Sequence, residues 1–323
     1  MKHLLLATLM ALCSVAVMAA EPDWAIHSEK ASQALLLDVV HAGNRLVVVG
    51  DRGHILTSDD QGQTWNQARV PTRQLLTAVY FVDAEHGWAV GHDAQILASS
   101  DGGQTWRQQY QNLESQAPLL DVWFLDRQRG FVVGAYGAFL ATEDGGEHWQ
   151  DISERLDNSE QLHLNAIAAI KDAGLFIVGE QGHMYRSADA GQSWQAVASP
   201  YDGSLLGVTA TGQPGTLLVY GLRGHLLRSA DFGQTWQSVC LPSGMQDGLA
   251  GASLLADGSL VVVGNGGSVL RSRDQGQSFT LVNRADRLAL SAVTQGAPGR
   301  LLMVGQGGVH IGAADGGPVV VQP

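Results

Sequence analysis

The sequence has few lysines, few cysteines and little charge. Three of its 323 residues are lysine, 15% are charged, and acidic residues outnumber Lys and Arg by 31 to 19. The net charge of −12 argues against a nucleic-acid partner, because phosphate binding needs a basic face. Of the two cysteines, Cys13 lies in an apolar N-terminal stretch, so Cys240 has no partner for an internal disulfide, and we expect it to be buried and inert.

Motifs that mark catalytic and cofactor sites are also missing. No Gly-x-Ser-x-Gly, His-Glu-x-x-His or Gly-x-x-x-x-Gly-Lys pattern occurs in the sequence. The Gly-Asn-Gly-Gly run at 264–267 is not followed by a helical pattern, as a phosphate-binding loop would be. We therefore expect no enzymatic activity and no cofactor.

Residues 1–20 have the pattern of a secretory signal. A basic start at Lys2 precedes an apolar run from Leu4 to Val17, which is shorter than the about 20 residues of a membrane-spanning helix, and small residues follow. We expect export through the Sec pathway to the periplasm, with cleavage after Ala19 or Ala20. Because Leu12 before Cys13 matches a lipoprotein box poorly, we expect no covalent membrane anchor. The remainder, 21–323, is predicted to be one domain and a monomer.

One motif recurs along the whole remaining chain. A Gly-x-x-Gly pattern followed by an apolar pair occurs seven times with small departures, and its first glycine is residue 50, 91, 134, 179, 221, 264 or 305. Each copy contains four short β-prone runs separated by turn residues, such as 76–81, 87–91, 95–99 and 105–109. Four strands in a period of about 40–45 residues are typical of a propeller blade. We predict an all-β, seven-bladed β-propeller of four-stranded antiparallel blades.

A second motif, Ser/Thr-x-Asp-x-Gly-x-Thr/Ser-Trp, follows each Gly-x-x-Gly pattern and is called the Asp box below. Its Asp can accept N–H bonds within the turn between the third and fourth strands, its Gly supplies a positive φ, and its aromatic residue packs between sheets. We assign these carboxylates a structural role, because a catalytic constellation has no need to repeat in every blade. The six well-formed boxes contain Asp60, Asp101, Asp144, Asp189, Asp231 and Asp274.

The ring also needs a closing strand. Trp24 lies 41 residues before Trp65, the first box tryptophan, and Trp65 lies 41 residues before Trp106. We therefore predict that residues 23–29 form the outer strand of the blade built from 289–313, so that the sheet edges are hidden. The segment 319–322 is a rival for this position.

Six Asp boxes in a sevenfold repeat behind an export signal resemble the photosystem II stability/assembly factor family of propellers. The resemblance extends over essentially all of 23–323. It implies a non-enzymatic periplasmic or lumenal factor that binds membrane-protein intermediates, with a membrane-protein complex or a transporter of the envelope as partner. The simple Sec-type signal, in place of the lipoprotein box or thylakoid signal of photosynthetic members, points to a non-photosynthetic bacterial member.

The Gly-x-x-Gly turns and the loops between blades share one face of a propeller, opposite the Asp boxes. Similar turns that hold unlike residues can present a binding surface on a fixed scaffold, and arginine suits carboxylate or phosphate recognition. Solvated arginines with local acidic partners are the alternative. The candidate partner-binding residues are Arg52, Arg73, Arg223, Arg287, Asp51, His92, Tyr136 and Glu180.

Three histidines occupy one repeat position, just after the second glycine of the turn. They are His54, His183 and His225, in blades 1, 4 and 5. The ring separates these blades, whereas zinc needs its ligands about 2 Å from one ion. We therefore expect no metal site.

An exported glycosidase of the sialidase type, or a carbohydrate-binding propeller, is the alternative function, because Asp boxes also occur in sialidases. Such an enzyme needs an arginine triad, a tyrosine nucleophile with a Glu partner and an acid/base Asp. Sialidases usually carry an Arg-Ile-Pro element, which this sequence lacks, and have six blades. The sequence favours the scaffold.

Overall fold

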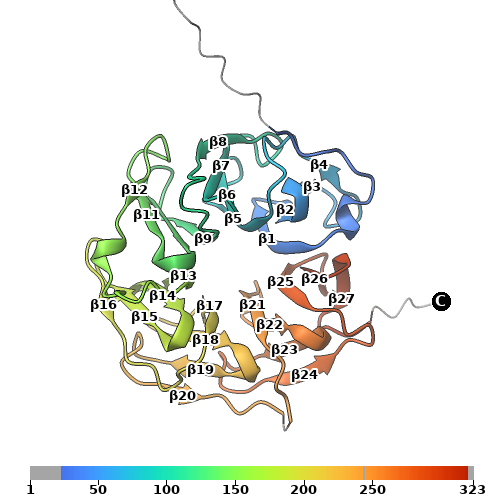
Figure 1. Ribbon diagram of the computed structural model, residues 1–323. Coiled ribbons are helices and arrows are strands. Elements are labelled where there is room, and N and C mark those ends of the chain that lie inside the picture. The colour runs from blue at the N-terminus through green and yellow to red at the C-terminus, as the bar shows by residue number, and fades with distance from the viewer. Residues whose placement is uncertain (1–22, 243, 319–323) are drawn as a thin grey trace, which may run out of the picture.

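Seven antiparallel β-sheets surround a central axis in the computed structural model, which describes residues 23–242 and 244–318 (Figure 1). This arrangement confirms the predicted all-β, seven-bladed propeller. Within the described residues the helical elements are seven short 3-10 turns, and none of them is long and apolar enough to cross a membrane. The predicted signal at 1–20 lies outside the described residues.

Each blade runs outward from the axis in chain order. The innermost strands are β1 (Leu36–Ala42), β5 (Leu76–Phe81), β9 (Leu119–Phe124), β13 (Leu164–Ile170), β17 (Leu205–Ala210), β21 (Leu249–Leu254) and β25 (Leu290–Gln295). The second strands are β2 (Arg45–Gly50), β6 (Gly87–Gly91), β10 (Gly130–Gly134), β14 (Gly174–Gly179), β18 (Leu217–Gly221), β22 (Leu260–Gly264) and β26 (Arg300–Gly305).

The outer half of each blade is shorter. The third strands are β3 (Ile55–Ser58), β7 (Gln95–Ser99), β11 (Phe139–Thr142), β15 (Met184–Ser187), β19 (Leu226–Ser229), β23 (Ser268–Ser272) and β27 (Gly308–Ala313). The outermost strands are β4 (Asn66–Gln67), β8 (Arg107–Tyr110), β12 (Gln150–Asp151), β16 (Gln195–Ala196), β20 (Gln237–Ser238) and β24 (Thr280–Asn283).

The core is divided among the blade boundaries. Seven clusters of buried apolar side chains each join two neighbouring blades, and one of them links blade 7 to blade 1 through residues such as Leu36 and Leu302. The second strands are buried on both faces, which explains their continuous apolar runs, such as 47–49 in β2. Burial between sheets therefore holds the ring together.

The Gly-x-x-Gly turns are 3-10 turns that the backbone closes. In blade 4, η5 (Glu180–Gly182) donates the Glu180 N–H to the carbonyl of His163, just before the inner strand, at 3.0 Å. Gly182 has a φ of 72°, and a Cβ there would lie against the carbonyl of Tyr201, so only glycine fits. Equivalent turns are η2 (Asp51–Gly53), η3 (Ala135–Gly137), η6 (Leu222–Gly224) and η7 (Asn265–Gly267).

Side chains of the inner strands join neighbouring blades. The carboxylate of Asp38 accepts the Val79 N–H of blade 2 at 2.9 Å, and the carboxylate of Asp121 accepts the Ile167 N–H of blade 4 at 2.9 Å. At two other boundaries, Thr77 donates to the carbonyl of Leu119 and Asn165 to that of Leu205. These bonds link backbones that no common sheet connects.

The predicted closing strand is wrong. Residues 24–28 are not a strand of blade 7: they lie beside the outer edge of blade 1, where the Ala25 N–H bonds to the Val70 carbonyl at 2.9 Å and Gln67 bonds to the backbone at both Ile26 and Ser28. Arg69 also lies over the ring of Trp24, at 4.1 Å. These polar partners on blade 1 hold the segment. Trp24 therefore does not occupy the position of a box tryptophan, although its spacing in the sequence is the same.

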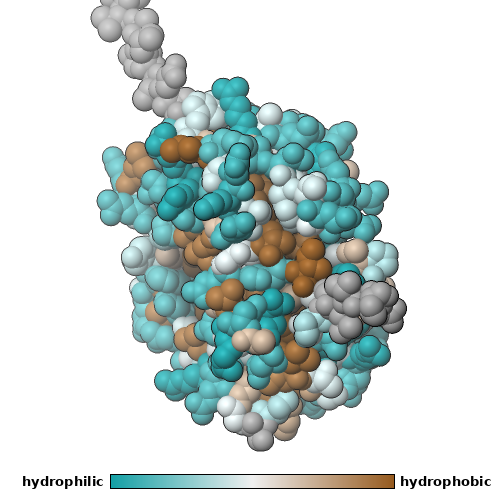
Figure 2. Space-filling model, turned by 90° about the vertical axis from the view of Figure 1, so that its right-hand side faces the viewer, coloured by the Kyte–Doolittle hydropathy of each residue, from teal (hydrophilic) through white to brown (hydrophobic). Residues whose placement is uncertain are grey.

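Blade 7 consequently has three strands among the described residues, β25–β26–β27. The N-terminal segment meets this blade at η1 (Ala31–Gln33), whose Ser32 carbonyl lies against Gly308 at the start of β27. Ile311 of β27 is exposed, and apolar surface shows among polar surface on this side of the ring (Figure 2). The rival segment, 319–322, lies outside the described residues.

The expectation for Cys240 is also wrong, because this cysteine is exposed. It lies in the loop that leaves β20, two residues before Pro242, rather than in a blade boundary. Cysteines are often buried, but this one is exposed because of its position in a loop of the repeat.

Candidate binding face

Each Asp-box carboxylate is engaged within its own turn. Asp60 accepts hydrogen bonds from Ser58 Oγ at 2.8 Å, from Thr64 N at 2.8 Å and from Thr64 Oγ1 at 2.5 Å, and these bonds, that of the Thr64 hydroxyl foremost, lower its pKa to about 2. In the third box, His148 Nδ1 replaces the hydroxyl, 2.7 Å from the carboxylate. The same pattern of bonds surrounds Asp101, Asp144, Asp189, Asp231 and Asp274.

The three equivalent histidines have separate surroundings. His54 is buried, and burial lowers its pKa; His183 lies beside Tyr185; and His225 stacks on Tyr201 with ring centroids 3.8 Å apart. Among the described residues, no group of three or more His, Cys, Asp or Glu is placed to hold a metal ion.

Two of the predicted arginines share a cavity of about 280 Å³ on the face of the Gly-x-x-Gly turns, called the turn face below. Arg52 is at the apex of η2 with its side chain 79% exposed, and Arg73 comes from the loop between blades 1 and 2. Arg73 pairs with Asp23 at 2.9 Å and donates to the Trp24 carbonyl, while Arg52 lies 3.4 Å from Asp51. Both cations therefore have acidic neighbours that are themselves open to solvent.

The other two arginines are placed elsewhere. Arg223 is at the exposed apex of η6 in blade 5, and Arg287 is in the exposed loop that joins blades 6 and 7. Neither lines the cavity of Arg52 and Arg73. The structure thus divides the candidate arginine patch into one pair and two separate cations.

Tyr136 and Glu180, from blades 3 and 4, are brought together by His163. The Tyr136 ring meets the His163 ring edge-on at 5.1 Å, and Glu180 accepts the His163 N–H at 3.0 Å. Sequence reasoning missed His163, although the repeat places it directly before an inner strand and hence on the turn face. His92 is half-buried in the turn of blade 2, where its N–H bonds to the Leu75 carbonyl.

More of the exposed apolar side chains lie on the turn face than on the rest of the described surface. Of the eight exposed large apolar residues in the described part of the chain, five lie in its turns, the loops between blades or the N-terminal segment, which makes this face the better candidate for binding. These five are Ile26, Leu35, Leu113, Tyr136 and Leu222.

A cavity of about 410 Å³ along the axis is lined by the inner strands. Asp38 and Asp121 line it, and burial raises their pKa values to about 6 and about 7, against the opposing effect of the backbone N–H groups they accept. Because these two carboxylates bond to neighbouring blades, we assign them a structural role in holding the ring together.

Comparison with known proteins agrees with this architecture. The family model of the photosynthesis system II assembly factor YCF48 matches residues 63–118 and 108–245, while no curated protein sequence matches the chain. Among solved structures, YCF48 bound to D1 peptide is 18% identical, with a TM-score of 0.67 over 92% of this chain and 97% of that one.

Two further structures share the fold. YCF48 from Cyanidioschyzon merolae is 18% identical, with a TM-score of 0.68 over 90% of this chain and 98% of that one. A streptogramin B lyase is 12% identical, with a TM-score of 0.73 over 87% and 93% of the two chains. At these identities the structures show a shared fold alone, whereas the family model matches more than half of the sequence, and the chain therefore belongs to the family of the photosystem II assembly factor YCF48.

Proposed function

We propose that this chain is an exported, non-catalytic scaffold that binds a segment of a membrane protein or another envelope partner and assists its assembly or stability. The observation that carries the proposal is the presence of unlike, exposed side chains at equivalent positions of the Gly-x-x-Gly turns. Family membership supports it, as does the peptide bound to a YCF48 of similar fold. The periplasmic location rests on the sequence of residues 1–20.

The turn face suits an extended peptide that carries both apolar and acidic groups. Arg52 and Arg73 offer guanidinium groups to a carboxylate, and Tyr136 and Leu222 offer apolar surface on other blades. Arg223 and Arg287 add separate cations along the ring. A peptide that crosses several blades can use several of these groups at once.

The absence of catalysis is part of the proposal. The box carboxylates are bonded inside their own turns, and the axial carboxylates bond to backbone N–H groups. We expect no turnover on a panel of fluorogenic sialosides and other glycosides. Turnover that Tyr136→Phe abolishes would support the glycosidase alternative instead.

Capture of partners from an envelope extract tests the proposal. The wild-type protein and the Arg52→Glu variant are each cross-linked to their partners in the periplasm and purified through a tag. The side chain of Arg52 is exposed, and reversing its charge should weaken capture of the partner several-fold. Arg127→Gln, on the opposite face, is the matched control and should capture as wild type does. Equal capture of an envelope protein by the wild type and by Arg52→Glu would contradict binding through the turn face. Capture of no protein at all would contradict it too.

A further inference from the structure

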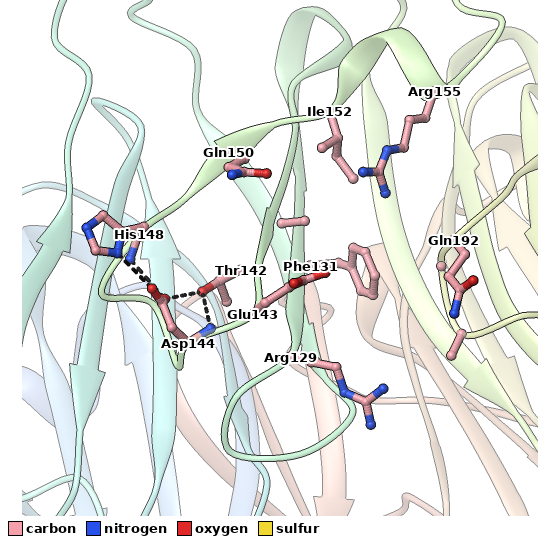
Figure 3. A pocket seen from close by; sticks show the side chains of 13 residues that line it. Arg129, Phe131, Thr142, Glu143, Asp144, His148, Gln150, Ile152, Arg155 and Gln192 are labelled. Atoms are coloured by element: carbon pink, nitrogen blue, oxygen red, sulfur yellow. Dashed lines mark hydrogen bonds and ion pairs between the residues drawn. The ribbon is translucent and has the colours of Figure 1, made fainter.

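A third cavity, of about 370 Å³, lies between blades 3 and 4 on the side of the Asp boxes (Figure 3). Its size falls in the range of about 300–1,000 Å³ that small-molecule sites occupy. Two buried side chains form an apolar floor: Phe131 of β10 and Ile152, which follows β12, are 7% and 3% exposed. Phe131 packs against the rings of Phe139 and Trp194, at 5.9 and 6.2 Å, so the floor is fixed.

Two guanidinium groups lie above and below this floor in the view of Figure 3. Arg155 extends from η4 (Ser153–Arg155), and no hydrogen bond or ion pair joins its guanidinium to the described part of the chain. Arg129 donates Nε and Nη2 to Asp126, at 2.9 and 2.7 Å, which holds the guanidinium in place and leaves Nη1 available. Gln192, from the Asp box of blade 4, adds an amide on the opposite wall.

Two carboxylates, those of Glu143 and Asp144, also line the cavity. Asp144 accepts bonds from Thr142 Oγ1 at 2.9 Å, from the His148 N–H at 2.9 Å and from His148 Nδ1 at 2.7 Å. These bonds hold the ionised carboxylate within its own turn. Glu143 is exposed to water.

We propose that this cavity binds a small organic carboxylate with an aromatic or aliphatic body. The body lies on Phe131 and Ile152, and the carboxylate accepts hydrogen bonds from the guanidinium of Arg155. The planar fork of arginine matches a carboxylate. An inorganic anion would leave the apolar floor uncovered, and a neutral ligand would form no ion pair with Arg155.

The test uses 3-phenylpropionate as the ligand. The uncharged alcohol 3-phenylpropanol, which has the same apolar body, is the control compound. Binding to the folded protein is followed by saturation-transfer NMR and by titration calorimetry. We expect saturable binding at one site for the acid and binding at least tenfold weaker for the alcohol. Arg155→Gln, an exposed position that does not carry the fold, should weaken binding of the acid about tenfold or more. Gln192→Glu should weaken it by repulsion.

Arg127→Gln is the control, because Arg127 is two residues from Arg129 but pairs with Asp83 of blade 2 at 2.7 Å and does not line the cavity. It should bind the acid as wild type does. The proposal is overturned if the acid does not bind saturably, if acid and alcohol bind equally, or if Arg155→Gln binds the acid as tightly as wild type.

Discussion

The two repeated turns of this propeller are closed in different ways. In the Asp box of blade 5, Asp231 accepts bonds from Ser229 Oγ and from Thr235 N and Oγ1, all within 2.8 Å. In the Gly-x-x-Gly turn of the same blade, the backbone makes the bond, from Leu222 N to the carbonyl of Ser204 at 3.2 Å.

The difference explains which residues repeat. Where side chains hold the turn, the same side chains must recur in blade after blade. Where the backbone holds it, only the glycines are constrained, and the apex is open to Arg52, Tyr136, Gln181 or Arg223. The side chains that close the Asp-box turns and the side chains proposed to bind a protein partner thus lie on opposite faces of one ring, and this contrast can be tested by substitution.

The largest expected effect comes from the glycine frame. Gly182→Ala places a Cβ against the carbonyl of Tyr201 at a φ of 72°, and we expect it to lower the free energy of unfolding by about 3 kcal/mol. Its neighbour Gln181, at a φ of 50°, is the matched control, and Gln181→Gly should change stability by less than about 1 kcal/mol. Urea unfolding of both variants measures the difference, and equal losses would remove the distinction between frame and apex.

The Asp-box hydroxyl should come second. Ser229 is buried, donates to Asp231 and accepts the Gly233 N–H at 2.8 Å. Ser229→Ala leaves that N–H buried without a partner, and we expect a loss of about 2 kcal/mol in the free energy of unfolding. Urea unfolding monitored by circular dichroism gives the value. A neutral result would mean that the box aspartate and the backbone suffice to hold the turn.

The two sets of carboxylates should act on stability in opposite pH ranges. Asp38 and Asp121 have pKa values raised to about 6 and about 7, so the folded chain binds more protons than the unfolded chain, and stability should fall as pH rises from about 4 to about 7. The box carboxylates, Asp274 for example, have lowered pKa values, and their contribution should be lost as pH falls below about 4.

Asp121→Asn tests this assignment. It should remove much of the decline between pH 4 and 7 and leave the loss below pH 4 unchanged. Asp274→Asn is its counterpart and should keep the decline above pH 4. The midpoints of urea unfolding are measured at several pH values. If both variants show the same dependence of stability on pH, the axial carboxylates do not cause the decline above pH 4.

The smallest effect on stability is expected at the apices. Arg52→Gln and Tyr136→Ala alter exposed side chains and should change the free energy of unfolding by less than about 0.5 kcal/mol. Both should nevertheless weaken capture of the partner. Thermal unfolding and capture are compared for each variant, and a large loss of stability would place these residues in the frame rather than on the binding surface.

The sequence predicted the parts of the structure that depend on local repetition. The spacing of the glycines and the Asp boxes was enough for the number of blades, the strand order and the position of both kinds of turn. It was not enough for the closing strand, because Trp24 has the spacing of a box tryptophan but packs under Arg69 of blade 1. The exposure of Cys240 and the grouping of Tyr136, His163 and Glu180 likewise depended on neighbours distant in sequence.

The sequence by itself determined the repeat, since each turn follows from a few adjacent residues whose backbone and hydrogen-bonding preferences are local. Only the tertiary structure decided which side chains from different blades come together: Arg52 with Arg73, His163 between Tyr136 and Glu180, and Arg155 with Arg129 around Phe131. The physical reason is that a propeller's period fixes the place of each residue within its blade, whereas cavities and surface clusters depend on contacts between blades that no single repeat contains.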